Sequence, residues 1–226
     1  NNLKNIFNKA LSYNSDFSKK LDLKLVSMKN LFNGLQTLYL HAKDQRQIID
    51  GVSFFKSLGI DKIVVIGGDE AHQIIEFLKN NNVSVIASHP HRLPSREDSD
   101  VKEAFKLAKT LVSNGINLSI DVRGGMERPN TRNLPFFAGS FVGNGLDYDA
   151  AIKALTINPA KILGIDKDYG SLEVGKSATF FVSKGDALDM KTNILYHAFI
   201  DGRELELSNY QTKLRDKFLE KVSRNN

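Results

Sequence analysis

Residues 155–186 read LTINPAKILGIDKDYGSLEVGKSATFFVSKGD, and within them a helical pattern is followed by a strand pattern. Pro159 has no N–H to donate and suits the first turn of a short helix, which Gly164 is placed to end. Beyond that helix, two glycines bracket residues 171–174, and residues 178–183 (ATFFVS) have the composition of a strand. The stretch therefore predicts a junction between a helical layer and a separate region of β-structure.

Upstream of the junction, four apolar runs alternate with helical patterns. One helix is predicted to begin after Asp44, a good N-cap, and to end at Gly59, because apolar residues recur between them at i, i+3, i+4 spacing. The apolar runs, each short enough for one strand, cover residues 35–40, 62–66, 83–87 and 116–122. Strand–helix units at this spacing predict right-handed crossovers and a parallel sheet with both faces covered.

Two segments after the junction, residues 178–184 and 193–207, are predicted to form hairpin strands with a turn at Asp201-Gly202. Ser208 is predicted to open a last helix, with Gln211 at the capping-box position. The first 34 residues show helical spacing of Leu, Ile and Phe and no pattern that indicates chemistry.

With 226 residues, 41% of them hydrophobic and 25% charged, the chain is long enough to bury a core. It has no cysteine, so any metal would be held by histidines and carboxylates. No apolar run is long enough to span a membrane, and the lysines behind the net charge of +5 are scattered without interleaved aromatic residues. We therefore expect neither a membrane nor a nucleic-acid partner. Because the chain begins Asn1-Asn2 without a Met, its compartment and whatever precedes it stay open.

The junction resembles the place where amidohydrolase-superfamily enzymes of the imidazolonepropionase type leave a TIM-like barrel and return to a small β-sandwich. The matching residues are Asn158-Pro159-Ala160-Lys161, Gly164, Gly170-Ser171-Leu172-Glu173, Gly175-Lys176 and Ala178, with Arg132-Asn133-Leu134-Pro135-Phe136 and Ala138-Gly139 upstream and Phe199-Ile200-Asp201-Gly202-Arg203 downstream. The resemblance implies an α/β fold: the C-terminal half of a TIM-like (β/α)8 barrel, strands 5–8, over residues 1–165. Residues 166–226 would be return strands of the β-sandwich and a C-terminal helix. An open doubly wound sheet, complete in itself, is the alternative fold.

The same resemblance assigns roles to two side chains at predicted strand ends. His41 ends the first strand, the fifth of the barrel by resemblance, where the superfamily supplies a metal-binding histidine. Asp121 ends the fourth, where the superfamily carries an aspartate that binds metal and takes a proton from the attacking water. The plainer alternatives are a hydrogen-bonded histidine at a strand–loop junction and an aspartate that caps a helix or pairs with Arg123. The implied cofactor is a divalent metal ion, zinc by preference.

The second and third strands end in other polar candidates. The second runs into Gly67-Gly68, where metal-active relatives usually carry a histidine, so His72 in the following helix is the remaining metal-ligand candidate there. A glycine pair before a helix is also a pattern that binds anions. His89 and His91 follow the third strand in a proline-containing loop, and we assign them to substrate binding, with plain solvent exposure as the alternative.

Arg123 and Arg132, beyond the fourth strand, are placed to hold a substrate carboxylate, unless they simply face water. With these residues in place, the resemblance implies metal-dependent hydrolysis of a C–N bond in a cyclic amide or a small peptide-like substrate. One alternative is a non-catalytic amidohydrolase-like domain or subunit that binds a ligand or partner, and another is a free-standing anion-binding module. For a half-barrel, we expect the N-terminal half of the barrel or a partner chain to cover the open side.

Overall fold

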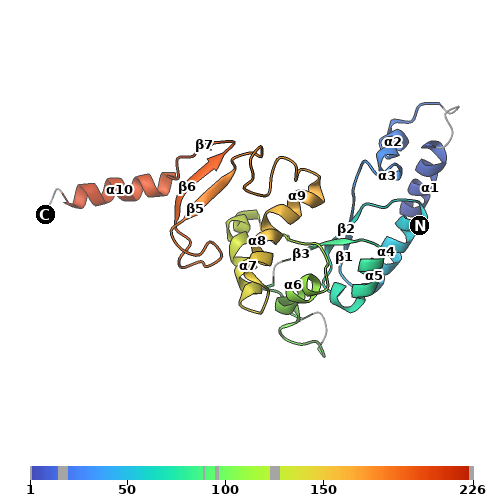
Figure 1. The fold of residues 1–226 in the computed structure, drawn as a ribbon, viewed down its shortest axis with the longest axis horizontal. Coiled ribbons are helices and arrows are strands. Elements are labelled where there is room, and N and C mark those ends of the chain that lie inside the picture. Colours follow the sequence, from blue (N-terminus) through green and yellow to red (C-terminus); the bar gives the residue numbers. More distant parts are fainter. Residues whose placement is uncertain (1, 15–19, 89, 95–96, 123–127, 224–226) are drawn as a thin grey trace.

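The computed structural model describes residues 2–14, 20–88, 90–94, 97–122 and 128–223. Figure 1 shows a main body of strands and helices, from which a small sheet and a last helix extend. The helix near the N-terminus lies at one end of the molecule and the last helix at the other.

Four parallel strands form the sheet of the main body. They are β1 (Leu38–Ala42), β2 (Ile63–Gly67), β3 (Ser84–Ala87) and β4 (Leu118–Ile120), in the order β1-β2-β3-β4. Each strand pairs with the next one in the chain, so the order contains no reversal of the kind that marks a doubly wound sheet. The parallel α/β arrangement predicted from the sequence is confirmed.

Helices connect these strands, as the sequence pattern predicts. α4 (Gln45–Ser57) follows β1, the short 3₁₀ helix η1 (Ala71–Ile74) and α5 (Ile75–Asn80) follow β2, and α6 (Glu103–Ser113) follows β3. The side chain of Asp44 accepts a hydrogen bond of 2.8 Å from the backbone N–H of Gln47, which confirms it as the N-cap of α4.

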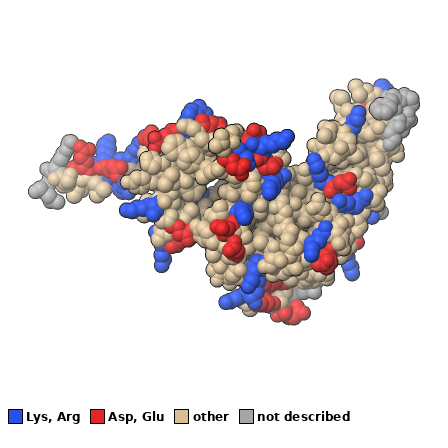
Figure 2. All heavy atoms as spheres, viewed as in Figure 1, with Lys and Arg blue, Asp and Glu red and all other residues tan. Residues whose placement is uncertain are grey.

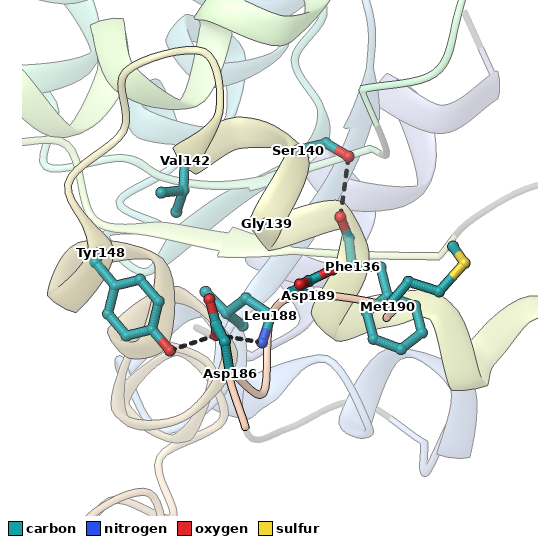
Figure 3. Close-up of a pocket in the computed structure, with 9 residues that line it drawn as sticks. All are labelled: Phe136, Gly139, Ser140, Val142, Tyr148, Asp186, Leu188, Asp189 and Met190. Atoms are coloured by element: carbon teal, nitrogen blue, oxygen red, sulfur yellow. Dashed lines mark hydrogen bonds between the residues drawn. The ribbon is translucent and has the colours of Figure 1, made fainter. Parts of the chain in front are cut away.

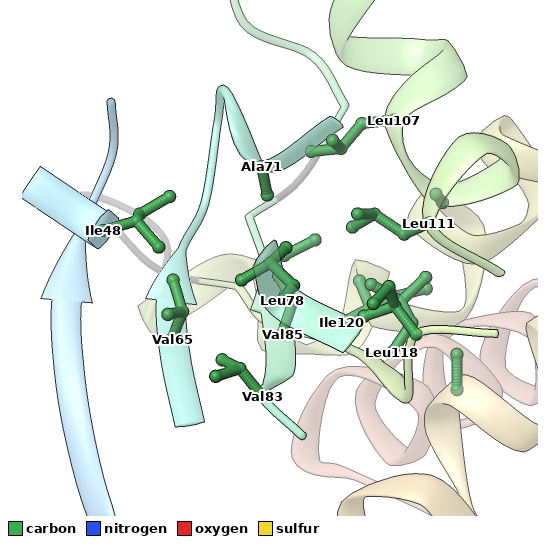
Figure 4. Close-up of a cluster of buried hydrophobic side chains, with 14 of the residues drawn as sticks. Ile48, Val65, Ala71, Leu78, Val83, Val85, Leu107, Leu111, Leu118 and Ile120 are labelled. Carbon is green, nitrogen blue, oxygen red and sulfur yellow. The ribbon is translucent and has the colours of Figure 1, made fainter. Parts of the chain in front are cut away.

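The hydrophobic core lies between this sheet and its helices. Figure 4 shows Val65, Val85 and Leu118, from three neighbouring strands, in one cluster with Leu78 of α5 and Leu111 of α6. All five side chains have 0% exposure. Burying an aliphatic side chain of this size stabilises a fold by about 1.5–3 kcal/mol relative to leaving it in water. This packing holds the strands in one register, because a slip of one residue would turn each strand's core side chains outward.

The two faces of the sheet differ at β1. Leu40 points toward the helices, since a Cβ built on Gly51 of α4 would lie 2.6 Å from its Cδ2 atom. Successive side chains of a strand alternate, so Tyr39 and His41 point to the opposite face. Both are exposed, Tyr39 to 36%. The prediction that both faces are covered is therefore wrong for β1 among the described residues.

Helices also precede β1, where the sequence showed apolar spacing without chemistry. They are α1 (Asn2–Asn14), α2 (Leu23–Val26) and α3 (Lys29–Phe32). The Phe7 ring of α1 packs on the Phe55 ring of α4 in an edge-on arrangement, with 4.8 Å between ring centroids. β1 begins at Leu38, later than predicted, because the backbone N–H groups of Leu35 and Gln36 both bond to the Asn30 carbonyl and close a turn there.

After β4 come the 3₁₀ helix η2 (Arg128–Asn133), α7 (Leu134–Val142), α8 (Tyr148–Leu155) and α9 (Ile157–Leu163). Asp147 caps α8 by accepting a 3.0 Å hydrogen bond from the Ala150 N–H. Gly164 ends α9 in the left-handed conformation, with φ of 72°. The predicted end of the helix at Gly164 is confirmed, and Pro159 lies in the first turn of α9.

A second sheet follows, with β5 (Phe180–Ser183), β6 (Leu195–Ile200) and β7 (Arg203–Glu204) antiparallel in the order β5-β6-β7. The turn between β6 and β7 has positive φ at Asp201 (50°) and Gly202 (76°), as a two-residue hairpin turn requires. The predicted turn is confirmed. Over the described ranges this region is a single sheet, so a sandwich would need strands from elsewhere.

The last helix, α10 (Tyr210–Ser223), contains no buried residue and projects from the second sheet (Figure 1). Its cap is Asn209, whose side chain accepts a 2.9 Å hydrogen bond from the Thr212 N–H, while the Thr212 hydroxyl accepts one from the Asn209 N–H. The prediction of Ser208 as the cap, with Gln211 beside it, is wrong by one residue. The Ser208 hydroxyl donates instead to the Glu206 carboxylate.

The surface mixes both signs of charge on the face that Figure 2 shows, where Lys and Arg side chains lie among Asp and Glu. Within the described part of the chain, none of the helices combines the length and the apolar character needed to cross a bilayer.

Candidate active site

The register of the parallel sheet places His41 and Asp121 on the same face. Ala42 of β1 lies level with Ile120 of β4, through the pairs that cross β2 and β3. His41 precedes Ala42 and Asp121 follows Ile120, so alternation turns both side chains to the face opposite that pair. The hydrogen bonds between β3 and β4 continue as far as Asp121, whose N–H donates a 2.9 Å hydrogen bond to the Ala87 carbonyl. At β1 the face they share is exposed at Tyr39 and His41, and α9 reaches it through the hydrogen bond from the Tyr39 hydroxyl to the Ile162 carbonyl.

Neither side chain is engaged elsewhere. Within residues 2–14, 20–88, 90–94, 97–122 and 128–223, no hydrogen bond or ion pair involves the His41 imidazole or the Asp121 carboxylate. His41 is exposed and Asp121 is half-buried. An available nitrogen donor and an available carboxylate on one face are what a metal ion or a polar substrate needs.

Gly67-Gly68, where a metal-binding histidine was expected by resemblance, has a backbone that excludes a side chain. Gly67 has φ of 104° and Gly68 has φ of 61°, which L-residues rarely adopt. A Cβ on Gly67 would lie 2.9 Å from the Ala42 carbonyl oxygen, and one on Gly68 would lie 3.0 Å from Val85 Cγ1. The 3₁₀ helix η1 follows, so an α-helix N-terminus for anion binding does not come directly after the glycine pair.

His72 lies in η1 and pairs with α6. Its Nε2 atom is 3.2 Å from Glu103 Oε1, and the two side chains are only 24% and 13% exposed. His72 Nδ1 and Glu103 Oε2 are buried without a hydrogen-bond partner. His72 thus joins η1 to α6, and among the described residues it belongs to no group of three side chains that could hold a metal ion. Its role as a metal ligand stays a prediction.

The two acidic residues before His72 also tie neighbouring loops together. Glu70, only 5% exposed, accepts a 3.1 Å hydrogen bond from the Gln45 N–H at the start of α4. Asp69 lies 3.5 Å from Arg92 Nε in the loop after β3. The loop after β2 is therefore fastened on both sides by its polar side chains.

His91 lies in the loop after β3 and reaches α7. Its Nε2 is 3.2 Å from Ser140 Oγ, and its ring packs edge-on against Phe105 and Phe137 at centroid distances of 5.6 and 5.5 Å. Arg132 is exposed in η2. His89 and Arg123 lie outside the described residues. The substrate-binding roles of these four residues stay predictions.

A shallow cavity of about 380 Å³ lies between α7, the start of α8 and the loop after β5 (Figure 3). Its polar centre is Asp186 Oδ1, which accepts a 2.7 Å hydrogen bond from the Tyr148 hydroxyl and a 2.8 Å bond from the Leu188 N–H. The Asp186 hydrogen bond, with some burial, raises the pKa of Tyr148. The donors and acceptors here satisfy one another, and none of the predicted site residues lines the cavity.

A second cavity, of about 650 Å³, lies beside β1 on the helix-covered side of the sheet and is lined by Leu3, Lys4, Leu40, Asp50, Gly51, Ser53, Phe54 and Phe55. It is separate from the face that carries His41 and Asp121, because Leu40 and His41 alternate along β1. Neither cavity is the candidate active site.

The donor types of His41 and Asp121 fit a divalent metal ion, since imidazole nitrogen and carboxylate oxygen are common zinc ligands. Among the described residues, however, no three His, Asp or Glu side chains come together to hold one. A metal centre built on this face would need a further ligand, either from residues outside the described ranges or from a polypeptide segment beyond these 226 residues.

The ion-pair partners of His72 and Asp69 could not be predicted from the sequence. Glu103 is 31 residues from His72 and Arg92 is 23 residues from Asp69 along the chain. Such separations leave no local pattern, and only the sheet register and helix packing bring the partners together. The Tyr148–Asp186 pair was missed for the same reason.

Comparison with known proteins shows the family of this chain. A model of the amidohydrolase family matches residues 30–209. Imidazolonepropionase of Syntrophobacter fumaroxidans is 31% identical over 86 residues, 38% of this chain and 20% of that protein. A 5'-deoxyadenosine deaminase of Methanobrevibacter smithii is 28% identical over 178 residues, 70% of this chain and 38% of that protein. The solved structure of an amidohydrolase from Thermotoga maritima matches 90% of this chain and 54% of its own, with a TM-score of 0.74 and 22% identity.

This chain spans about half, or less, of the length of the relatives it matches. The structural likeness, at 22% identity, shows a shared fold. The family model, in contrast, covers most of the 226 residues and includes all four parallel strands, His41 and Asp121. The chain belongs to the amidohydrolase family.

Proposed function

We propose that this chain carries part of the active site of a metal-dependent hydrolase that cleaves a C–N bond in a cyclic amide or a small peptide-like substrate. The observation that carries the proposal is the shared face of His41 and Asp121, on which neither side chain has a partner among the described residues. Membership of the amidohydrolase family supports a hydrolase that acts on C–N bonds. Imidazolonepropionase and deaminase relatives point the same way.

The proposal includes a fold. We infer that β1 to β4 are strands 5–8 of a (β/α)8 barrel over residues 1–165, and that residues 166–226 hold the return strands of a β-sandwich. The sequential strand order and the exposed face of Tyr39 and His41 at β1 support this, because a barrel interior faces away from the helices that connect its strands. The N-terminal half of the barrel, or a partner chain, would then lie against the outer edges of β1 and β4 and supply the remaining metal ligands.

Curvature decides whether the two residues converge. In a flat sheet the strands lie about 4.8 Å apart, so β1 and β4 would be separated by about 14 Å. Zinc is bound by histidine and carboxylate atoms at about 2.1 Å, which two donors on such distant strands reach only if the sheet curves toward the face that carries His41 and Asp121. A barrel provides that curvature.

In this arrangement Asp121 accepts a proton from the attacking water, and His41 offers a ring nitrogen to the metal ion. A bound divalent ion supplies Lewis acidity and lowers the pKa of a bound water toward neutrality. The half-buried position of Asp121 leaves its carboxylate within reach of a substrate on this face. Arg132, exposed in η2, would hold a carboxylate of the substrate.

The test is turnover by the complete protein, with this chain and whatever completes its barrel, on a panel of cyclic amides, aminopurine nucleosides and dipeptides. Asp121→Asn keeps the size of the side chain and removes the base, so activity should fall by about 100-fold or more. Asp50→Asn, on the helix side of the sheet, is the matched control and should leave the rate unchanged. Equal activity in the wild type and Asp121→Asn would refute the role of Asp121.

A non-catalytic binding domain is the second candidate. It is favoured by the glycine pair in place of a strand-six ligand and by the engagement of His72 with Glu103. For such a domain, Asp121→Asn and His41→Ala would fold normally and retain the same co-purifying partner, and no member of the panel would be hydrolysed by the wild type.

A further inference from the structure

Helix α9 is hydrogen-bonded to both outer strands of the parallel sheet. The Asn158 side chain donates a 2.8 Å hydrogen bond from Nδ2 to the Leu118 carbonyl of β4. The Tyr39 hydroxyl of β1 donates a 3.2 Å hydrogen bond to the Ile162 carbonyl of α9. These contacts join parts of the chain 40 and 123 residues apart.

The bond to Leu118 lies at the free edge of the sheet. Val85 N–H donates to the Asn117 carbonyl and Asp121 N–H donates to the Ala87 carbonyl, so these alternate residues of the β4 segment face β3. The Leu118 carbonyl, between them, points to the other side, where Asn158 reaches it. An edge strand is thereby fixed three residues before Asp121.

The bond from Tyr39 joins α9 to the opposite edge of the sheet, at β1. Tyr39 points to the same face of the sheet as His41, two residues later in β1, so α9 reaches that face. Burial raises the pKa of Tyr39, so the hydroxyl stays protonated and able to donate at neutral pH. Asn158 and Ile162 are separated by about 6 Å along α9, and the reach of the two side chains makes up most of the remaining width of the sheet.

α9 is itself firmly seated. A Cβ on Gly170 would lie 2.7 Å from Ala160 Cβ and 2.9 Å from Ile157 Cα, so the loop after α9 packs directly on its first turns. Ile165 N–H donates a 2.9 Å hydrogen bond to the Ala160 carbonyl just beyond the cap at Gly164. A helix held in this way acts as a rigid spacer.

We propose that α9 is a strap that sets the curvature of the sheet, and that Asn158 and Tyr39 are positioning residues for His41 and Asp121. The hydrogen-bonded sheet fixes the spacing of neighbouring strands but leaves its curvature adjustable. α9 links β1 to β4 through its hydrogen bonds to Tyr39 and Leu118. The strap is independent of the proposed hydrolase, whereas the positioning role rests on it.

Electron paramagnetic resonance between two spin labels measures the strap directly in this chain. The sequence has no cysteine, so Gln36→Cys before β1 and Ser113→Cys before β4, both at exposed positions, can be labelled without background. Tyr39→Phe removes one hydroxyl and Asn158→Ala one amide. Each substitution should broaden the distribution of label–label distances and increase the mean distance. The reason is that β1 and β4 move apart as the sheet flattens, toward the separation of about 14 Å that they would have in a flat sheet. Asn158→Gln, which keeps the amide, should restore part of the shift.

Tyr148→Phe is the matched control, since it removes a hydroxyl bonded to Asp186 at 2.7 Å, away from the strap. An unchanged label–label distance in Tyr39→Phe and Asn158→Ala overturns the strap, and so does an equal change in Tyr148→Phe. If Asn158→Ala does not fold, the result for Tyr39→Phe alone decides whether the strap exists. The zinc bound by the complete protein separates the two claims. A wider sheet with less zinc supports the positioning role, and a wider sheet with unchanged zinc overturns it. The label distance requires no turnover, so it stands whether or not the hydrolase proposal fails.

Discussion

Gly164 shows how one residue serves the candidate site from a distance. It ends α9 with φ of 72°, and no atom lies within 4 Å of the place where a Cβ would be. Backbone conformation, and not lack of space, therefore requires glycine here. Gly170, with φ of 95°, is required on both grounds, because its Cβ would collide with α9. The glycines that match the family motif thus fix the helix that joins the outer strands.

Gly164→Ala should lower the free energy of unfolding by about 1 kcal/mol, because an L-residue is strained at positive φ. Gly143→Ala is the matched control at the end of α7, where φ is −60° and an added Cβ would make only ordinary contacts. That variant should be neutral or more stable by up to about 1 kcal/mol, through the unfolded chain. Urea unfolding measures both, and equal stability in the two variants would show that Gly164 is not held at positive φ in solution.

Site residues at the ends of strands could be predicted from the sequence, whereas the partners that tertiary packing brings to them could not. His41 and Asp121 follow from their places at the ends of apolar runs, because a strand brings its last residues to one edge of a parallel sheet. The partner of His72 does not follow, since Glu103 comes from the next helix and meets it only after the sheet has formed. The same holds for Asn158, whose motif is visible in the sequence but whose bond to Leu118 is not.

Helix α10 is the element whose stability should depend least on the rest of the molecule. It contains no buried residue, so its start at Asn209 is fixed by the reciprocal bonds with Thr212 and not by burial in the core. Asn209→Ala should cost about 1 kcal/mol of local helix stability. Hydrogen exchange should accelerate in residues 210–223 and stay unchanged in β1–β4. Faster exchange in the parallel sheet would mean that α10 is coupled to it.

Elements were predicted better than their ends. The apolar runs identified the parallel strands, yet β4 is limited to Leu118–Ile120, whereas residues 116–122 were expected. Ile116 is instead part of the turn after α6, where its N–H bonds to the Leu111 carbonyl. The glycine pair after β2 was read as a possible anion site, and the structure gives it a packing reason through Ala42 and Val85.

At the scale of the whole molecule, the exposed side chains at β1 and on the second sheet suggest a surface that needs a cover. Tyr39 is 36% exposed, and Phe181, Val182 and Tyr196 are exposed by 46%, 44% and 65%. Exposed strands with apolar side chains pair with whatever is available. The isolated 226-residue chain should therefore self-associate or bind the dye ANS. A compact monomer by sedimentation that binds no ANS contradicts the half-barrel proposal.

The metal content of the complete protein tests the central claim, that His41 and Asp121 form one site, most directly. Zinc per chain is measured by mass spectrometry after dialysis, for the wild type, His41→Ala, Asp121→Asn and His72→Ala. We predict that the first two variants lose zinc, because each removes a donor from the shared face. His72→Ala should keep its zinc and lose stability instead, by about 1–3 kcal/mol, because the buried Glu103 carboxylate is left without its partner. Zinc retained in both His41→Ala and Asp121→Asn, or lost only in His72→Ala, would contradict the account.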